Sequence, residues 1–196
     1  MKEKLTRVQV LAELENNRDF SGKDLSNLDL QNLDFSEADM HNANLTGALL
    51  CCSNLNRVNL TGSVIEKANL KNAFFSRANL FNADLRESNL SKTNLGGANL
   101  ENANLSGAIL VDAYLSGANL KSALLEKADL TRARCSLANM ESADLSMACL
   151  VSVDFGGAKL QSANFSLADM SKCKLYKAKA IGANFKQANL TNANLF

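Results

Sequence analysis

Apolar side chains recur along this chain at a strict interval of five residues. From Phe20 to Leu195 every fifth residue is large and apolar except Cys135 and Ala180, which gives 36 consecutive pentapeptides. The position two residues before most of these centres is small, and from residue 38 onward it is alanine in 25 of 32 cases. Asn or Asp usually lies between the two, so the repeated unit reads Ala-Asn/Asp-Leu.

A period of five fits neither an α-helix nor a plain β-strand. Five steps along a helix turn the side chain by about 500°, so the centres would form no stripe, and a half-buried strand needs apolar residues at every second position. The inward spacing of two and then three residues fits a chain that runs straight for about three residues and then turns. Repetition of that unit predicts stacked coils, which is an all-β solenoid. The chain has no proline, in agreement with a backbone whose N–H groups are needed between coils.

The tandem A(N/D)LXX motif resembles the pentapeptide repeat family over about nine-tenths of the chain. The resemblance implies that four repeats make one square coil, and that the coils form a right-handed quadrilateral β-helix. This chain would then have about nine coils and, at a spacing of about 4.8 Å, a length of about 43 Å. Asparagines 20 residues apart should stack into one continuous amide ladder, formed by Asn59, Asn79, Asn99, Asn119 and Asn139.

The first residues break the repeat. Between residues 3 and 16, Leu5, Val8, Leu11 and Leu14 recur at helical spacing. Because the first coil of a solenoid exposes its core and unpaired backbone groups, we expect this helix to close that end. A helix that binds a partner is the alternative. The predicted domains are a capping helix over residues 1–17 and a β-helix over residues 18–196.

Composition limits the classes of function. The 196 residues fit one domain, and the net charge of +1 gives no overall attraction to nucleic acid. The charge is uneven, since residues 11–40 hold eight acidic and two basic side chains, whereas residues 159–187 hold six lysines and one aspartate. No apolar run reaches the roughly 20 residues of a membrane span, and the start of the chain lacks an apolar signal segment. We therefore expect a cytoplasmic protein that does not enter a membrane.

The chain carries no recognisable catalytic or metal-binding motif. Its five cysteines form no disulfide framework, because Cys135 and Cys173 should point inward two coils apart, about 10 Å, which exceeds disulfide reach. The single histidine, His41, should lie on a flat outward face near Asp39, where no pocket excludes water. We assign no catalytic, cofactor-binding or metal-ligating residue and expect no enzymatic activity.

Outward positions that depart from the polar habit are the candidate interaction sites. The first set of candidates for partner binding consists of an apolar patch, Leu137, Met147, Cys149, Val151 and Leu167, and separately of the basic C-terminal segment with Lys172, Lys174, Lys177 and Lys179. A second is the final coil, where an open end should pair with a second copy through Phe185, Leu190, Leu195 and Phe196. The resemblance implies the same, since some members of the family dimerise through their C-terminal coils.

Two functions follow as hypotheses. The first is a non-enzymatic, rigid module that binds an unidentified protein partner and forms a homodimer. The alternative, implied by resemblance to the fluoroquinolone-resistance members of the family, is a mimic of duplex DNA that binds DNA gyrase. Mimicry of DNA requires a strongly negative surface, and this chain departs from that requirement. Nucleic acid is an unlikely partner from the sequence, because the basic segment shows no interleaved aromatic residues.

Overall fold

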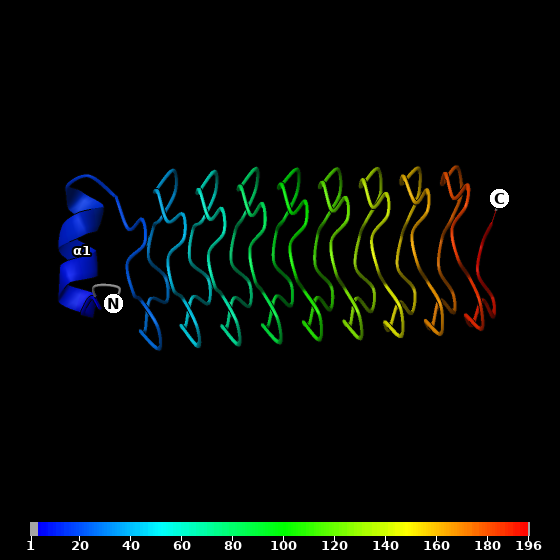
Figure 1. The fold of residues 1–196 in the computed structure, drawn as a ribbon, viewed down its shortest axis with the longest axis horizontal. Helices are drawn as coiled ribbons and strands as arrows, with labels where there is room; N and C mark the ends of the chain where they lie inside the picture. Colours follow the sequence, from blue (N-terminus) through cyan, green and yellow to red (C-terminus); the bar gives the residue numbers. More distant parts are fainter. Residues whose placement is uncertain (1–3, 196) are drawn as a thin grey trace.

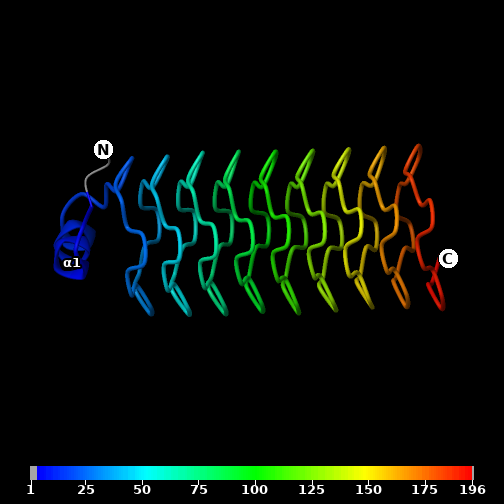
Figure 2. The ribbon, with the colours of Figure 1, turned by 60° about the horizontal axis from the view of Figure 1, so that its bottom comes forward.

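The computed structural model describes residues 4–195, which form a rod with a helix at one end (Figure 1). The helix, α1, spans Arg7–Glu15, and the chain then winds in stacked coils away from it (Figure 2). Thr6 starts α1 with a capping box, in which the Gln9 N–H donates to Thr6 Oγ1 and the Thr6 N–H donates to Gln9 Oε1. This arrangement satisfies two backbone N–H groups that a helix start leaves without partners.

Each pentapeptide consists of a three-residue side and a two-residue corner. The second corner residue has a positive φ at every fifth position from Gly22 to Asn192, whereas the first corner residue does not. A positive φ at the third residue only is the pattern of a type II turn. The turn is closed by the N–H of the small residue, as where Ala118 donates to the carbonyl of Leu115 at 3.0 Å.

Successive coils are joined by parallel bridges between residues 20 apart, such as Asn99 and Asn119. Twenty residues contain four corners, so each coil is a square. In the inner coils three N–H groups of each pentapeptide bond to a neighbouring coil, for example Leu100 to Asn119, Asn102 to Lys121 and Asn99 to Ala78, at 2.6–3.0 Å. Within residues 4–195 the pairing consists of isolated bridges, because each side is too short for a longer strand.

The recurring Asn or Asp provides the acceptor that the backbone lacks. The N–H of the first corner residue points to no carbonyl of another coil, and it donates instead to the side-chain oxygen two residues earlier. Thr131 N–H thus donates to Asp129 Oδ1 at 2.9 Å, and Ser171 N–H to Asp169 Oδ1 at 3.0 Å. Every buried or half-buried backbone donor needs a partner, so this position is structural.

The core is a single column of side chains along the axis of the rod. The apolar centres and the alanines between residues 38 and 170 are at most 1% exposed, as predicted from the five-residue period. Cys135 is fully buried, and the neighbouring phenylalanines Phe155 and Phe165 meet edge to face with ring centroids 6.0 Å apart. All five cysteines are free thiols.

Two expectations about local structure are wrong in detail. The amide ladder is not continuous, because Asn79 donates to Thr61 Oγ1 at 2.9 Å and not to Asn59. The Thr61 hydroxyl already bonds Asn59 Oδ1 at 2.8 Å and so stands between the two amides. From Asn79 to Asn139 the ladder is intact, with amide–amide distances of 3.1–3.2 Å.

The N-terminal helix also buries fewer of its apolar side chains than their helical spacing suggests. Val10 is fully buried and Leu14 packs against the first coils, but Val8 is 76% exposed and Leu11 is 41% exposed. Leu5 is buried before the helix begins. One side of α1 therefore covers the first coil while another faces solvent. No helix in residues 4–195 has both the length and the hydropathy that a membrane span requires.

Candidate interaction faces

The square coil turns positions 20 residues apart into columns on the outside of the rod. One side and its two corners carry apolar residues in two groups, separated by the polar coil of Lys127, Asp129 and Thr131, which together we call the apolar face. Its members are Ile109, Val111, Met147, Cys149, Val151 and Leu167. Met147, Cys149 and Val151 belong to one coil, in which they occupy a corner, the middle of a side and the next corner.

Met147 and Leu167 lie one above the other at the first of these corners. Both are exposed, at 46% and 52%, and both hold the corner position with a φ of about 60°. A residue with a β-carbon costs about 1–2 kcal/mol in this conformation, which glycine or asparagine adopts more easily. Neither the backbone nor the core gains from an apolar side chain at this corner.

Cys149 lies at the centre of the apolar face. Its Sγ is 3.2 Å from the Thr131 hydroxyl, which in turn donates to Asp129 Oδ1 at 2.6 Å. Ile109 precedes Asp129 in the same column and is 42% exposed. The face thus extends from Ile109 to Leu167 and is interrupted by one polar coil at Asp129. Its surface is largely aliphatic, with hydroxyl groups.

The structure divides the predicted interaction residues among different faces. Leu137 and Met147 are two corners apart in one coil, so they lie at diagonally opposite edges of the square. Lys172, Lys174 and Lys177 lie on the side next to the apolar face and on its two corners. The sequence neighbours that suggested one surface therefore belong to at least two surfaces.

Leu137 has a local packing role at its own corner. A β-carbon added to Gly157 would lie 2.9 Å from Leu137 Cδ2, and one added to Gly156 would lie 2.3 Å from the ring of Tyr176. The side chains from the coils before and after thus fill the space above the two glycines. Lys179 lies in the column of the amide ladder, on the side that follows this corner.

His41 and Asp39 meet as the sequence suggested, with 2.9 Å between His41 Nδ1 and Asp39 Oδ1. The Asp39 carboxylate also accepts from Asn59 Nδ2 at 2.9 Å, and both side chains are nearly half exposed. In the part of the chain that the structure describes, no group of three or more His, Cys, Asp or Glu side chains is arranged to hold a metal ion.

A sequence profile of pentapeptide repeats matches the chain in eight copies between residues 16 and 195. This chain belongs to the pentapeptide repeat family. The resemblance indicated by the A(N/D)LXX motif is confirmed, and with it the right-handed quadrilateral β-helix that the family adopts. No curated protein sequence matches this pentapeptide repeat protein.

Solved structures of similar proteins belong to the same family. QnrB1, a plasmid-mediated fluoroquinolone resistance protein, is 22% identical in one structure, which covers 98% of this chain and 86% of QnrB1 with a TM-score of 0.54. HetL, a protein involved in heterocyst differentiation regulation from the cyanobacterium Nostoc sp. strain PCC 7120, is 28% identical. That match covers 97% of this chain and 94% of HetL with a TM-score of 0.38. At 22% identity the likeness to QnrB1 concerns the fold alone.

The last coil of this pentapeptide repeat protein is the least buried part of its core. Phe185 and Leu190 are partly buried and Leu195 is 54% exposed, whereas centres in earlier coils are fully buried. The rings of Phe165 and Phe185 stack in parallel, with centroids 5.1 Å apart, which leaves the outer face of Phe185 toward the end of the rod. Phe196, the fourth residue predicted at this end, lies outside the described residues.

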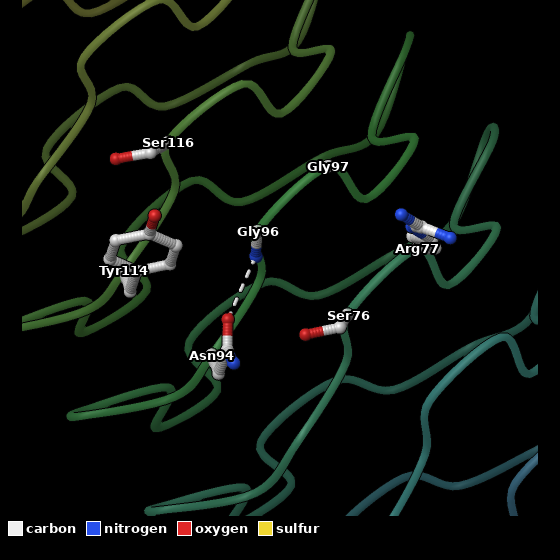
Figure 3. A pocket seen from close by; sticks show the side chains of 7 residues that line it. All are labelled: Ser76, Arg77, Asn94, Gly96, Gly97, Tyr114 and Ser116. Carbon is white, nitrogen blue, oxygen red and sulfur yellow. Dashed lines mark hydrogen bonds between the residues drawn. The ribbon is translucent and has the colours of Figure 1, made fainter.

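The sequence led us to expect flat outward faces. The outside of the rod, however, is not flat everywhere. A shallow depression of about 490 Å³ is lined by Ser76, Arg77, Asn94, Gly96, Gly97, Tyr114 and Ser116 (Figure 3). It forms where Gly96 and Gly97 remove the side chains of one corner. Periodicity alone does not reveal it, although the Gly-Gly pair in the sequence is a signal for it.

Proposed function

We propose that this pentapeptide repeat protein is a non-enzymatic interaction module whose apolar face binds a protein partner. The observation that carries the proposal is the contiguous group of Met147, Cys149, Val151 and Leu167 on the surface of a rod whose core is complete without them. Contiguous exposed apolar groups rimmed by polar residues are typical of protein-binding surfaces. Stacked coils hold such a group in fixed geometry, so little conformational entropy is lost on binding.

The experiment uses substitutions that the corner backbone already accepts. Lysine occupies the same corner position at Lys127 and Lys172, with φ values of 59° and 61°. We therefore compare Met147→Lys with Leu167→Lys in affinity capture from native lysate, followed by a binding titration with the captured protein. Burial of one such side chain at an interface contributes about 1.5–3 kcal/mol of binding free energy, so each variant should bind the partner about tenfold more weakly or worse.

Leu137→Lys is the matched control, because Leu137 has the same turn position and a φ of 60° but lies at the diagonally opposite corner. It should capture the same partner with unchanged affinity. The proposal fails if every protein captured by the native chain is also captured by Met147→Lys and Leu167→Lys. It also fails if all three variants lose a captured protein equally.

We further propose a homodimer that joins two copies through their last coils. The exposure of Leu195 and the uncovered ring face of Phe185 support it, because contact with a second copy would bury both. Sedimentation at micromolar concentration should give a dimer for the native protein and a monomer for Leu195→Glu. A monomeric native protein in the same measurement removes the proposal.

Protection of DNA gyrase is the second candidate function. The fold of QnrB1 is its only support, and the surface argues against it, since duplex mimicry needs a uniformly negative rod. A supercoiling assay with gyrase and a quinolone decides between the two. Absence of protection at a large excess of the protein leaves the interaction module as the function.

A further inference from the structure

One side of the rod collects most of the positive charge. We call this side and its two corners, in the coils after residue 50, the basic face. It carries nine basic side chains and two acidic ones, whereas the other three sides over the same coils carry seven basic and nine acidic ones. The basic residues of this face are Arg57, Lys71, Arg77, Lys92, Arg132, Arg134, Lys172, Lys174 and Lys177. A chain with a net charge of only +1 therefore has a strongly positive side.

Most of these cations are available to a ligand. Arg57 pairs with Glu37 at 3.0 Å, and Arg132 binds Asp112 through two nitrogens at 2.7 and 2.9 Å. In residues 4–195, the remaining seven form no ion pair, and Arg77, Arg134 and the three C-terminal lysines of the face are exposed. Two carboxylates of the face offset part of this charge, since the hydrogen bond from Arg132 and, with it, the charges of Lys92 and Arg134 lower the pKa of Asp112, and Asp154 lies between Arg134 and Lys174 in their column.

Aromatic side chains are interleaved with these cations on the same face. Phe74, Tyr114, Arg134 and Lys174 occupy a single column, and Tyr176 lies at the adjoining corner. The three aromatic residues are 40–48% exposed. They are separated by 40 and 62 residues in the sequence, and only Tyr176, between Lys174 and Lys177, lies within the basic C-terminal segment, which we had expected from the sequence to be free of interleaved aromatic residues. The winding of the coils creates the pattern.

The depression at Gly96 and Gly97 gives this face a binding place of defined shape. Figure 3 shows Tyr114 on one side of the two glycines and Arg77 on the other. A β-carbon at Gly96 would lie 2.8 Å from Tyr114 Cε1, so the ring packs on bare backbone. Arg134 follows Tyr114 directly in the next coil. Because the Tyr114 ring covers Gly96, a planar group can stack on the exposed side of that ring, beside the Gly97 corner and the Arg77 guanidinium, with the Arg134 cation one coil away.

We propose that the basic face binds single-stranded nucleic acid. Proteins that bind single strands combine a positive track for the phosphates with exposed rings on which the bases stack, and sequence preference is weak because every base has a flat face. From Phe74 to Lys174 the face extends over five coils, or about 24 Å, which suits a strand of several nucleotides. An acidic protein would use the cations but has no need of three separate rings, and the bases of a duplex are not free to stack on them.

The test measures binding of the full chain to a labelled single strand of about 12 nucleotides by fluorescence anisotropy over a series of salt concentrations. Tyr114→Ala should weaken binding by about five- to a hundredfold, while Tyr114→Phe retains it. The double variant Arg134→Ala/Lys174→Ala should make the slope of log affinity against log salt less steep by about 1.4, since each phosphate contact contributes about 0.7.

Lys121→Ala/Lys186→Ala is the charge-matched control, because both lysines lie on other sides of the rod; its slope should equal that of the native protein. Polyglutamate, a duplex of equal length and anionic lipid vesicles are the competing ligands. The proposal is overturned if the single strand does not bind at about 50 mM salt, if Tyr114→Ala binds it as the native protein does, or if any of the three competitors binds as tightly. Circular dichroism of each variant confirms that the fold is retained.

Discussion

The corner at Gly117 allows a direct measurement of what the turn conformation costs. Gly117 has a φ of +68°, it is exposed, and a β-carbon placed on it would meet no atom within 4 Å. Its N–H donates to the carbonyl of Ser136 at 3.0 Å, a bond that any side chain leaves in place. Gly117→Ala therefore changes the backbone energy and nothing else.

The expected magnitude follows from two opposing terms. Left-handed conformation costs a residue with a β-carbon about 1–2 kcal/mol, whereas loss of glycine's freedom in the unfolded chain returns about 0.4–1 kcal/mol. Gly117→Ala should lower the free energy of unfolding by about 1 kcal/mol. Gly117→Asn should stay within about 0.5 kcal/mol of the native protein, because asparagine tolerates this conformation. Gly117→Val should lose the most, since a β-branched residue is an outlier there.

Urea denaturation followed by circular dichroism measures these differences, provided that the m-value is unchanged. In a chain of this size, 1 kcal/mol corresponds to a shift of about 2–4 °C in Tm. Ser116→Ala, at the other corner position of the same turn, is the control and should stay within about 0.5 kcal/mol. The reasoning is refuted if Gly117→Ala is as stable as the native protein, or if Gly117→Asn is less stable than Gly117→Ala.

Three further predictions concern the core, the thiols and acid. Leu120 is fully buried in the middle of the rod. Leu120→Ala should lower the free energy of unfolding, measured in urea, by about 2–5 kcal/mol. A smaller loss would mean that the coils close the cavity. In the native protein a thiol reagent should label the exposed Cys52 first and leave Cys173 unlabelled by peptide mass spectrometry, because burial raises the pKa of Cys173 to about 12. Hydrogen bonds from Ser26 and Ser36 lower the pKa of Asp24 and of Asp34 below the usual 3.8. The stability that the two ionised carboxylates contribute is complete above pH 3.8 and is lost as the pH falls through their lower pKa in the folded state. The Tm should therefore drop between about pH 5 and pH 2. An equal Tm at these two pH values would contradict the prediction.

The sequence predicted the architecture because the repeat restricts every core position. A small residue and a large one, two and three residues apart, predict stacked coils, and the resemblance to the family supplied the four sides of each coil. The undersized centre Cys135 is buried in register with its neighbours, so even the weak repeats keep the geometry. The role of the Asn or Asp before each centre was not predicted, because it depends on which backbone N–H lacks a carbonyl partner.

The arrangement of the faces could not be derived from neighbours in the chain. Leu137 and Met147 are ten residues apart and lie at opposite edges of the rod, whereas Phe74 and Tyr114 are 40 residues apart and share a column. Only the number of sides in a coil decides which residues meet. Side-chain contacts such as that of Tyr114 with the backbone of Gly96 depend in addition on which corner residues are glycine.

Departures from Asn or Asp before the centre show that the four columns differ in chemistry. A side chain without a carboxylate or amide oxygen at this position gives up a hydrogen bond worth about 0.5–1.5 kcal/mol to the next corner. At Phe74 the neighbouring coil supplies the acceptor instead, since Ser76 N–H donates to Asn56 Oδ1 at 2.8 Å. The substituted residues are Leu49, Ile109 and Cys149 in one column, Phe74, Tyr114, Arg134 and Lys174 in the next, Lys159 and Lys179 in the third, and Val64 and Leu124 in the fourth. Aliphatic and thiol groups are thus confined to columns without aromatic or basic ones. A backbone that needs only an acceptor would place its exceptions without regard to column, so their sorting by chemistry supports an apolar and a basic face that meet at the corner of Val151 and Lys172.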